Sequence, residues 1–308
     1  MESRPCVAVL MAACNGLPWI EQQIDSILQQ QGVRLELFIS VDPSSDDTRS
    51  YCHARQAADP RVHLLPGEGP GSASGNFLRL LGEVPLAGFD YVALADQDDI
   101  WLEDKLARGI LCLQKEGADG YSSSFTAFWD NGQPERYVDK SAPQTEYDYL
   151  FESPGPGCSF ILAPRLVDSF RQHLKGVSAE KLHQLQFHDW LIYAFARYRG
   201  FDWFIDSESR LRYRQHGENV IGVNHGLKAV VARLQAVFSE EWQNQVVLTA
   251  DLIGMGQHPF VRKWRQLSAR SYGFLMLNTR KIRRNKSDRN VLIFLFFILI
   301  FLSFLKRS

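Results

Sequence analysis

Short apolar runs alternate with amphipathic stretches along the first third of the chain. Runs bounded by turn residues predict buried strands at residues 7–12, 35–41, 62–65 and 91–95. Between them, apolar residues recur at helical spacing, first at Ile20, Ile24, Ile27 and Leu28, and Gly32 is expected to end that helix. Further helices are expected to reach residue 58 and to include residues 77–81. This alternation predicts an α/β fold that starts as a doubly wound, parallel sheet.

The pattern is less regular in the second half. Strands are predicted at residues 123–129, 159–162, 203–205 and 211–214, and a helix from His188 through Tyr198. Residues 131–144 are predicted to form a polar loop. Helical periodicity dominates residues 227–284.

The last apolar run, residues 291–305, is apolar on every side. As a helix it would extend roughly 22 Å, which is shorter than the ~30 Å hydrocarbon core of a bilayer. Two interpretations stay open: a helix packed inside the protein, or a segment that spans a thinned bilayer or inserts from one side. The preceding residues 280–289 hold six basic residues against one acidic residue, which favours the cytoplasmic face of an anionic membrane.

Composition supports a globular protein, because 45% of the 308 residues are hydrophobic and 22% are charged. The net charge of −1 hides a basic C-terminal part, which suits an anionic membrane or nucleic acid. The five cysteines show no CxxC or Cys/His spacing. Neither a disulfide framework nor a zinc site is indicated, and a reducing cytoplasm fits.

An acidic turn gives the strongest indication of chemistry. Asp96, Asp98 and Asp99 directly follow the predicted strand at residues 91–95, and ligands bind at the carboxyl ends of such strands. Three carboxylates so close together repel one another, so a divalent cation with oxygen ligands, Mg²⁺ or Mn²⁺, is expected here. The alternative is an acidic cap for a helix that residues 100–102 would begin.

Other polar residues follow neighbouring strands. Asn15 and Asp42 come after the first two predicted strands, and right-handed crossovers bring these strand ends to the edge that carries the acidic turn. The glycine-rich residues 67–75 and Asn76 open a helix where backbone N–H groups could meet a diphosphate, although the segment does not match GxxxxGK[ST]. Together these positions predict a nucleotide-and-metal site.

Six motifs in a fixed order carry a family resemblance. They are ACNG at 13–16, QQIDSIL at 22–28, Asp42 with residues 44–48, DQDDIW at 96–101 with Lys105, HDW at 188–190, and YRQH at 213–216 with Asn219. In these the chain resembles family 2 glycosyltransferases of the GT-A fold, which are inverting enzymes that use nucleotide-sugar donors. It looks most like the bacterial rhamnosyltransferases of lipopolysaccharide core and O-antigen assembly. Pro43 and Cys14 depart from the family pattern at the nucleotide-binding loops.

The resemblance implies roles for individual residues. The donor would be bound by Ala13, Asn15, Asp42, Asn76, Asp96 and Arg214, and the metal by Asp98, Asp96 and His216. Asp189 would be the general base, and the acceptor side would include Gly157, Cys158, His188 and Trp190. Simpler alternatives are a helix-capping acid for Asp189, a loop histidine for His216 and a solvated basic face for Arg214.

The implied reaction is transfer of L-rhamnose from dTDP-L-rhamnose to a lipid-linked saccharide of the cell envelope, without a nucleic-acid partner. The alternatives are another donor such as a UDP-hexose, a sugar-phosphate nucleotidyltransferase, or a non-enzymatic saccharide-binding protein. We expect a catalytic domain at residues 1–225, a basic helical extension at 226–290 and an apolar membrane segment at 291–308. The protein would be attached by that segment to the cytoplasmic face of the bacterial inner membrane.

Overall fold

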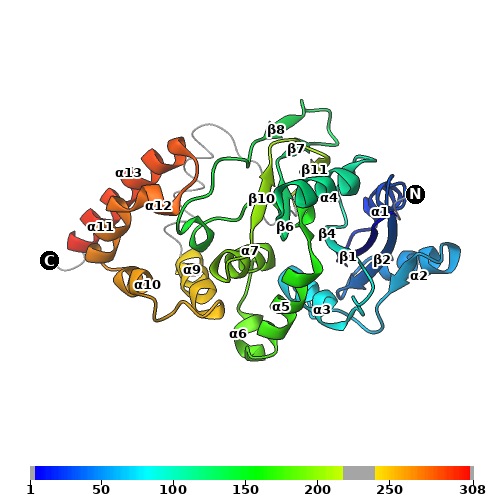
Figure 1. Ribbon diagram of the computed structural model, residues 1–308, viewed down its shortest axis with the longest axis horizontal. Coiled ribbons are helices and arrows are strands. Elements are labelled where there is room, and N and C mark those ends of the chain that lie inside the picture. Colours follow the sequence, from blue (N-terminus) through cyan, green and yellow to red (C-terminus); the bar gives the residue numbers. More distant parts are fainter. Residues whose placement is uncertain (1–3, 218–239, 306–308) are drawn as a thin grey trace. The chain divides into compact units, whose positions relative to one another are not determined.

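The computed structural model describes residues 4–217 and 240–305 (Figure 1). The chain divides into two compact units. The first contains Met1–Ser141 and resumes at Pro154, and the second combines Ala142–Ser153 with the C-terminal helices. The expected domain limit at residue 225, like Asn219, lies outside the described residues, and the limit at residue 290 falls within the last helix. These domain limits therefore stay a prediction.

A seven-stranded mixed sheet forms the core of the first unit, in the order β10-β6-β9-β4-β1-β2-β3. Its strands are β1 (Cys6–Ala13), β2 (Arg34–Val41), β3 (Val62–Leu64), β4 (Tyr91–Ala95), β6 (Gly120–Ser123), β9 (Ile161–Leu162) and β10 (Trp203–Asp206). The four strands predicted in the first third of the chain are confirmed, and they pair in parallel. β9 runs antiparallel to both β4 and β6, so the sheet as a whole is mixed. Val7 through Met11 are fully buried, as expected for a strand covered on both faces.

Helices cover both faces of this sheet (Figure 1). They are α1 (Ile20–Leu28), α2 (Thr48–Ala58), α3 (Ala73–Glu83), α4 (Lys105–Glu116), α5 (Pro164–Leu174), α6 (Ala179–His183) and α7 (His188–Tyr198). α3, α5 and α7 pack on one another and lie below the strands in Figure 1, whereas α4 lies above them. Ser72 caps α3 by accepting a hydrogen bond from the Gly75 N–H, which explains where the helix after the glycine-rich segment begins.

A second sheet has four strands in the order β5-β11-β7-β8. Its strands are β5 (Ile100–Trp101), β7 (Phe125–Phe128), β8 (Arg136–Val138) and β11 (Leu211–Arg214). The strand expected at residues 123–129 is divided at Ser124 between the two sheets, and the expected polar loop contains β8. The strand expected at 159–162 is shorter, because the 3₁₀ helix η2 (Gly157–Ser159) precedes β9.

The prediction that a helix begins at residues 100–102 is wrong. Ile100 and Trp101 form β5, which pairs antiparallel with β11, and α4 begins only at Lys105. The backbone N–H groups here bond to other segments: that of Trp101 donates to Ser26 Oγ at 3.1 Å, and that of Leu102 donates to the Arg210 carbonyl at 3.0 Å. These long-range bonds replace the local ones that a helix would need.

The second unit is helical in its described part. It contains η1 (Asp148–Leu150), α9 (Glu240–Leu252), α10 (Pro259–Trp264), α11 (Ala269–Leu277), α12 (Thr279–Ile282) and α13 (Lys286–Leu305). α13 packs against α11, and Trp264 is fully buried. Asp148 and Glu152 form ion pairs with Arg284, which connects the inserted segment Ala142–Ser153 to these helices. Among the described helices, none combines the length and apolar character needed to cross a membrane.

The tight contact between β6 and β10 generates a test of the core. A Cβ atom on Gly120 would lie 2.2 Å from Cε3 of the buried Trp203 ring. We expect Gly120→Ala to lower the free energy of unfolding by about 1–3 kcal/mol, because the ring must shift in a packed core. The matched control is Gly82→Ala on the exposed end of α3, where no atom lies within 4 Å of the new methyl group. It should raise stability by about 0.5–1 kcal/mol. Equal effects of both changes in urea denaturation would contradict this packing.

Candidate active site

The ends of three neighbouring strands form the centre of the candidate site. The parallel register pairs Ala13 with Val41 and Met11 with Ala95, so the residues that follow β1, β2 and β4 lie at one edge of the sheet. Gln97, the second residue of the acidic turn, bonds the backbone of Cys14: its Oε1 accepts from the Cys14 N–H at 2.7 Å, and its Nε2 donates to the Cys14 carbonyl at 2.6 Å. The turn after β4 is therefore fixed to the turn after β1.

Side chains of α1, together with Gln30 just after its end, hydrogen-bond the backbone of the acidic turn and of the segment that follows it. Gln23 Nε2 donates to the Asp96 carbonyl at 2.9 Å, and Ser26 Oγ accepts from the Trp101 N–H. The Gln30 side chain reaches two residues beyond the turn: its Nε2 donates to the Leu102 carbonyl at 2.7 Å, and its Oε1 accepts from the Leu106 N–H at 2.9 Å. Its Nε2 also donates to the Ser26 carbonyl at 3.2 Å. Gln23, Ser26 and Gln30 are all buried, so these bonds satisfy groups that water cannot reach.

Arg214 holds the acidic turn from β11. Its backbone N–H donates to Asp99 Oδ1 at 3.1 Å, and its Nε donates to the Asp98 carbonyl at 2.7 Å. The rest of the guanidinium contacts Asp130 and Gln22. Arg214 is only 3% exposed. Although the family resemblance implied a phosphate contact, the side chain is engaged here with protein groups that keep the turn in shape.

Asp98 and His216 lie in direct contact. His216 Nε2 is 2.7 Å from Asp98 Oδ2, and both side chains are mostly buried. Trp19 stacks on the His216 ring with centroids 4.0 Å apart and planes at 17°. Trp19 is not among the predicted site residues, because no sequence pattern links the residue before α1 to His216, almost two hundred residues later. The stacking fixes the plane of the imidazole toward Asp98.

Asp96 and Asp99 lie with Cys158 in a buried cluster. Their potential ligand atoms are within 4.8 Å of one another, and this group of described residues does not include Asp98 or His216. Burial, and then the charge of Asp98, raise the pKa of Asp96 to about 7 and that of Asp99 well above its ordinary value. Burial also keeps Cys158 a thiol by raising its pKa. A divalent cation beside the turn would oppose these effects on the carboxyl groups.

Lys105 is a buried cation near this cluster, although its Nζ makes no hydrogen bond with it. Its Nζ lies 3.6 Å from the centre of the Trp101 ring, and the side chain is buried. Burial lowers the pKa of Lys105 to about 7, although negative charge on Asp99 would raise it. The ammonium group therefore compensates the acidic turn only in part.

The donor-side residues surround the end of β2. Asp42 is buried, its Oδ1 accepts from the Gly71 N–H at 2.9 Å, and its N–H donates to the Ala13 carbonyl at 2.8 Å. Burial raises the pKa of Asp42, and the Gly71 hydrogen bond opposes that rise. Asn15 has a positive φ of 49° and accepts from the Ser45 N–H at 2.7 Å, so the first two strand-end loops are joined. Asn76 is buried and donates to the Ser40 carbonyl.

The start of α7 carries the acceptor-side residues. Asp189 lies in the first turn, where its Oδ1 accepts from the Trp190 N–H at 2.8 Å. His188 stacks on Phe77 at 3.9 Å, and burial lowers its pKa to about 3, so its ring is neutral. A Cβ atom on Gly157 would lie 2.8 Å from His188 Nε2 and 3.1 Å from the Asp189 Cβ, so only glycine fits there. This contact brings Gly157 and Cys158 next to Asp189, and Trp190 is buried in the packing of the helix.

A mixed sheet with Asn15 after β1, Asp42 after β2 and an acidic turn after β4 is the arrangement of GT-A glycosyltransferases. A mannosyltransferase from Pyrobaculum calidifontis, solved with GDP-Man and Mn²⁺, matches with a TM-score of 0.52 and 15% identity over 100% of this chain and 89% of its own. TarS from S. aureus in complex with UDP matches with a TM-score of 0.52 and 12% identity over 93% and 90% of the two chains. At these identities the likeness shows the fold alone.

The sequence comparisons show the family. The profile described as Glycosyl transferase family 2 matches residues 8–174. The dTDP-rhamnosyl transferase RfbG of Shigella flexneri is 35% identical over 295 residues, which cover 94% of this chain and 100% of the relative. The chain belongs to glycosyltransferase family 2, and the protein is a glycosyltransferase.

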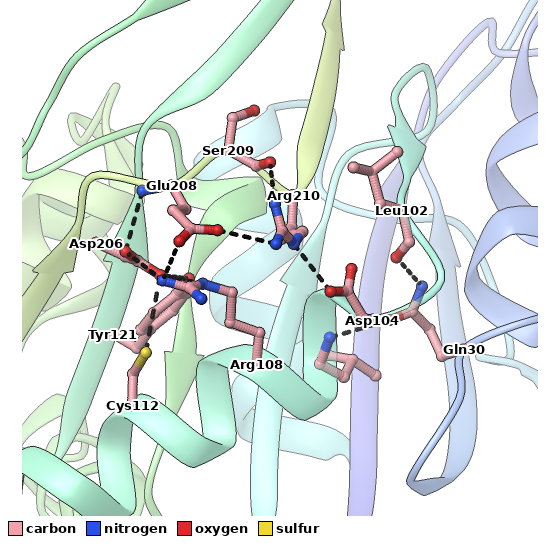
Figure 2. A network of polar contacts seen from close by, with 11 residues as sticks. Gln30, Leu102, Asp104, Arg108, Cys112, Tyr121, Asp206, Glu208, Ser209 and Arg210 are labelled. Atoms are coloured by element: carbon pink, nitrogen blue, oxygen red, sulfur yellow. Dashed lines mark hydrogen bonds and ion pairs between the residues drawn. The ribbon is translucent and has the colours of Figure 1, made fainter.

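Gln30 also ends a network of polar contacts that supports the site from the side of α4 (Figure 2). Arg108 pairs with the buried Asp206 at 2.7 Å, and Arg210 pairs with Asp104 at 2.9 Å. Glu208 connects these two pairs, at 3.3 Å from Arg108 and 2.8 Å from Arg210. Burial disfavours the charged form of Asp206, but the hydrogen bonds from Arg108 and the Glu208 N–H outweigh it and lower its pKa. The loop between β10 and β11 is thereby attached to α4.

The side-chain hydrogen bonds of Gln30 lead to a prediction about stability. Gln30→Leu should lower the free energy of unfolding by about 1–3 kcal/mol, because the buried N–H of Leu106 loses its partner and the Leu102 carbonyl keeps only the Lys105 N–H. Gln29→Leu is the matched control, since Gln29 is the exposed neighbour of Gln30 at the end of α1. This change should alter stability by less than about 0.5 kcal/mol. The measurement is urea denaturation. Equal stability of the two variants would contradict the role of Gln30.

Proposed function

We propose that this glycosyltransferase transfers L-rhamnose from dTDP-L-rhamnose to a lipid-linked saccharide acceptor of lipopolysaccharide or O-antigen. The observation that carries the proposal is the 35% identity with dTDP-rhamnosyl transferase RfbG across nearly the whole chain. The geometry supports it, since the strand-end loops that would bind a nucleotide lie next to the acidic turn and to Asp189.

The donor nucleotide is assigned to the end of β2. The carboxylate of Asp42 is the acceptor for N–H and O–H groups of the base or ribose, with Ala13, Asn15 and Asn76 forming the surrounding walls. Gly69 must lack a side chain, because a Cβ atom there would lie 2.2 Å from Asp42 Oδ1. The backbone of the glycine-rich segment thus packs directly against the carboxylate that is proposed to bind the nucleotide.

A divalent cation, Mg²⁺ or Mn²⁺, fits the donor set of the acidic turn. Carboxylate oxygens are the preferred ligands of both ions. The pKa of Asp96 is raised first by burial and then by the charge of Asp98, and a cation would oppose both effects. We assign the ion to Asp98 and His216, which already contact one another, with Asp96 beside them. A bound ion would neutralise charge that develops on the leaving diphosphate.

Asp189 is the proposed general base. Its carboxylate would accept the proton of the acceptor hydroxyl while that oxygen attacks the anomeric carbon on the face opposite the diphosphate. One displacement of this kind inverts the anomeric configuration. His188 is neutral and stacked on Phe77, so its proposed role is to shape the acceptor side with Gly157, Cys158 and Trp190, not to exchange a proton.

The second unit is proposed to attach the enzyme to the cytoplasmic face of the inner membrane. The exposed basic residues Arg280, Lys281 and Lys286 precede or begin α13, whose sequence is strongly apolar. Attachment of this kind would keep the enzyme near a lipid-linked acceptor and near anionic lipid.

The donor and the metal are tested together. We expect release of dTDP from dTDP-L-rhamnose with Mn²⁺ or Mg²⁺, little release of UDP from UDP-hexoses, and none in EDTA. Asp98→Ala should lower turnover by at least ~10²-fold and remove metal-dependent donor binding. The control Glu116→Ala changes an exposed acid at the end of α4 and should leave both unchanged. Preferred hydrolysis of a UDP-hexose would replace the donor assignment, and full activity in EDTA would exclude the metal.

The base is tested by separating binding from transfer. Asp189→Asn preserves the shape of the side chain but cannot accept the proton, so we expect transfer to fall by ~10²–10⁴-fold. Affinity for dTDP-L-rhamnose, measured by calorimetry, should stay within about twofold, because the carboxylate acts on the acceptor. Asp168→Asn on α5 is the matched control, since Asp168 is exposed. A parallel loss of donor affinity would make Asp189 a binding residue instead.

A further inference from the structure

α13 has two chemically similar faces with different surroundings. Leu292, Leu295, Phe296 and Leu299 are buried, and Phe296 stacks on Tyr272 of α11 with ring centroids 6.2 Å apart. The other face forms an exposed stripe, with exposed fractions of 39% for Ile293, 60% for Phe294, 62% for Phe297, 58% for Phe301 and 42% for Leu302. Their spacing of three or four residues places them on one side of the helix. We call these five residues the apolar stripe.

The apolar stripe differs from the other exposed apolar residues of the described chain. In the first unit such residues come from separate elements, as do Leu111 of α4 and Tyr137 of β8. Single exposed apolar residues are ordinary, whereas several that adjoin on one helix face mark a surface that binds a partner. Three of the five are phenylalanines, which are favoured where a helix meets lipid.

The charges near the apolar stripe indicate the kind of partner. Arg280, Lys281 and Lys286 are exposed just before or at the start of α13, and Lys281 pairs with Glu146 at 2.8 Å. A second copy paired through this stripe would present another apolar stripe flanked by the same exposed basic residues, and so would not supply these residues with an anionic surface. An anionic lipid surface offers both an apolar interior for the stripe and negative charge for the basic residues.

We propose that α13 lies in the plane of an anionic bilayer with the apolar stripe immersed, as an interfacial anchor. This rests on the proposed membrane attachment and specifies its geometry. The buried face decides the orientation, because a helix that inserted end-on would have to withdraw Leu292, Leu295, Phe296 and Leu299 from α11. A helix in the plane keeps that packing and places Phe294 and Phe301 at the same depth.

Depth measurements test the orientation. A fluorescent amino acid is introduced at position 294 or 301 of the full-length enzyme by amber suppression, and quenching is measured with lipids brominated at different positions along the chain. The in-plane helix predicts equal, shallow depths at both positions. An end-on insertion predicts depths that differ by about 10 Å, the rise of seven helical residues, and would overturn the proposal.

Vesicle flotation tests the surface itself. The triple change Phe294→Ser, Phe297→Ser and Phe301→Ser should lower binding to vesicles of phosphatidylethanolamine and phosphatidylglycerol by at least tenfold, without a change in melting temperature. Leu111→Ser is the control, since Leu111 is 63% exposed on the first unit. Binding should also fall with added salt or in phosphatidylcholine vesicles. Unchanged flotation of the triple variant, or loss of self-association instead of lipid binding, would overturn the proposal.

Donor hydrolysis separates this proposal from the proposed function. It needs no membrane, so the triple variant should release dTDP from dTDP-L-rhamnose at the normal rate. Loss of vesicle binding with normal dTDP release supports the anchor. Normal flotation in an enzyme that uses another donor would refute the proposed donor and leave the anchor standing.

Discussion

The structure of the catalytic unit depends on confining three carboxylates at the end of β4. Like charges at this distance favour a more open turn, and burial increases the cost of keeping them close. Neutral side-chain amides and one guanidinium oppose this opening of the turn, because they hydrogen-bond its backbone from two sides. Gln23 does so from α1, Gln30 from just after the end of α1, and Arg214 from β11. Both α1 and β11 must therefore pack against the same turn.

The parts of the fold that the sequence predicts are those set by local pattern. The first four strands are short apolar runs between turn residues, and their parallel pairing follows from the helices between them. For the same reason the sequence alone predicts that Asn15, Asp42 and the acidic turn lie at one edge of the sheet. The pattern along the chain also predicted that His188 and Asp189 open a helix.

The parts that the sequence did not predict depend on contacts between distant residues. β5 has only two residues, and its pairing is decided by β11, which lies far along the chain. Trp19 is a helix-start residue whose stacking on His216 has no periodic signal. The grouping of Ala142–Ser153 with the C-terminal helices rests on ion pairs with Arg284, and charge in a loop does not reveal its partner. Local propensity cannot specify these choices.

The hydrogen bonds from α1 and Gln30 to main-chain atoms determine which side chains of the turn segment can change without loss of support. Gln23, Ser26 and Gln30 bond carbonyl and N–H groups, which every residue of the turn segment possesses whatever its side chain. These bonds therefore hold the backbone at Asp96, Trp101 and Leu102 without using the side chains of those residues. A change of side chain at these three positions leaves this support in place, whereas Gln97 and Asp99 hold the turn through their own side chains.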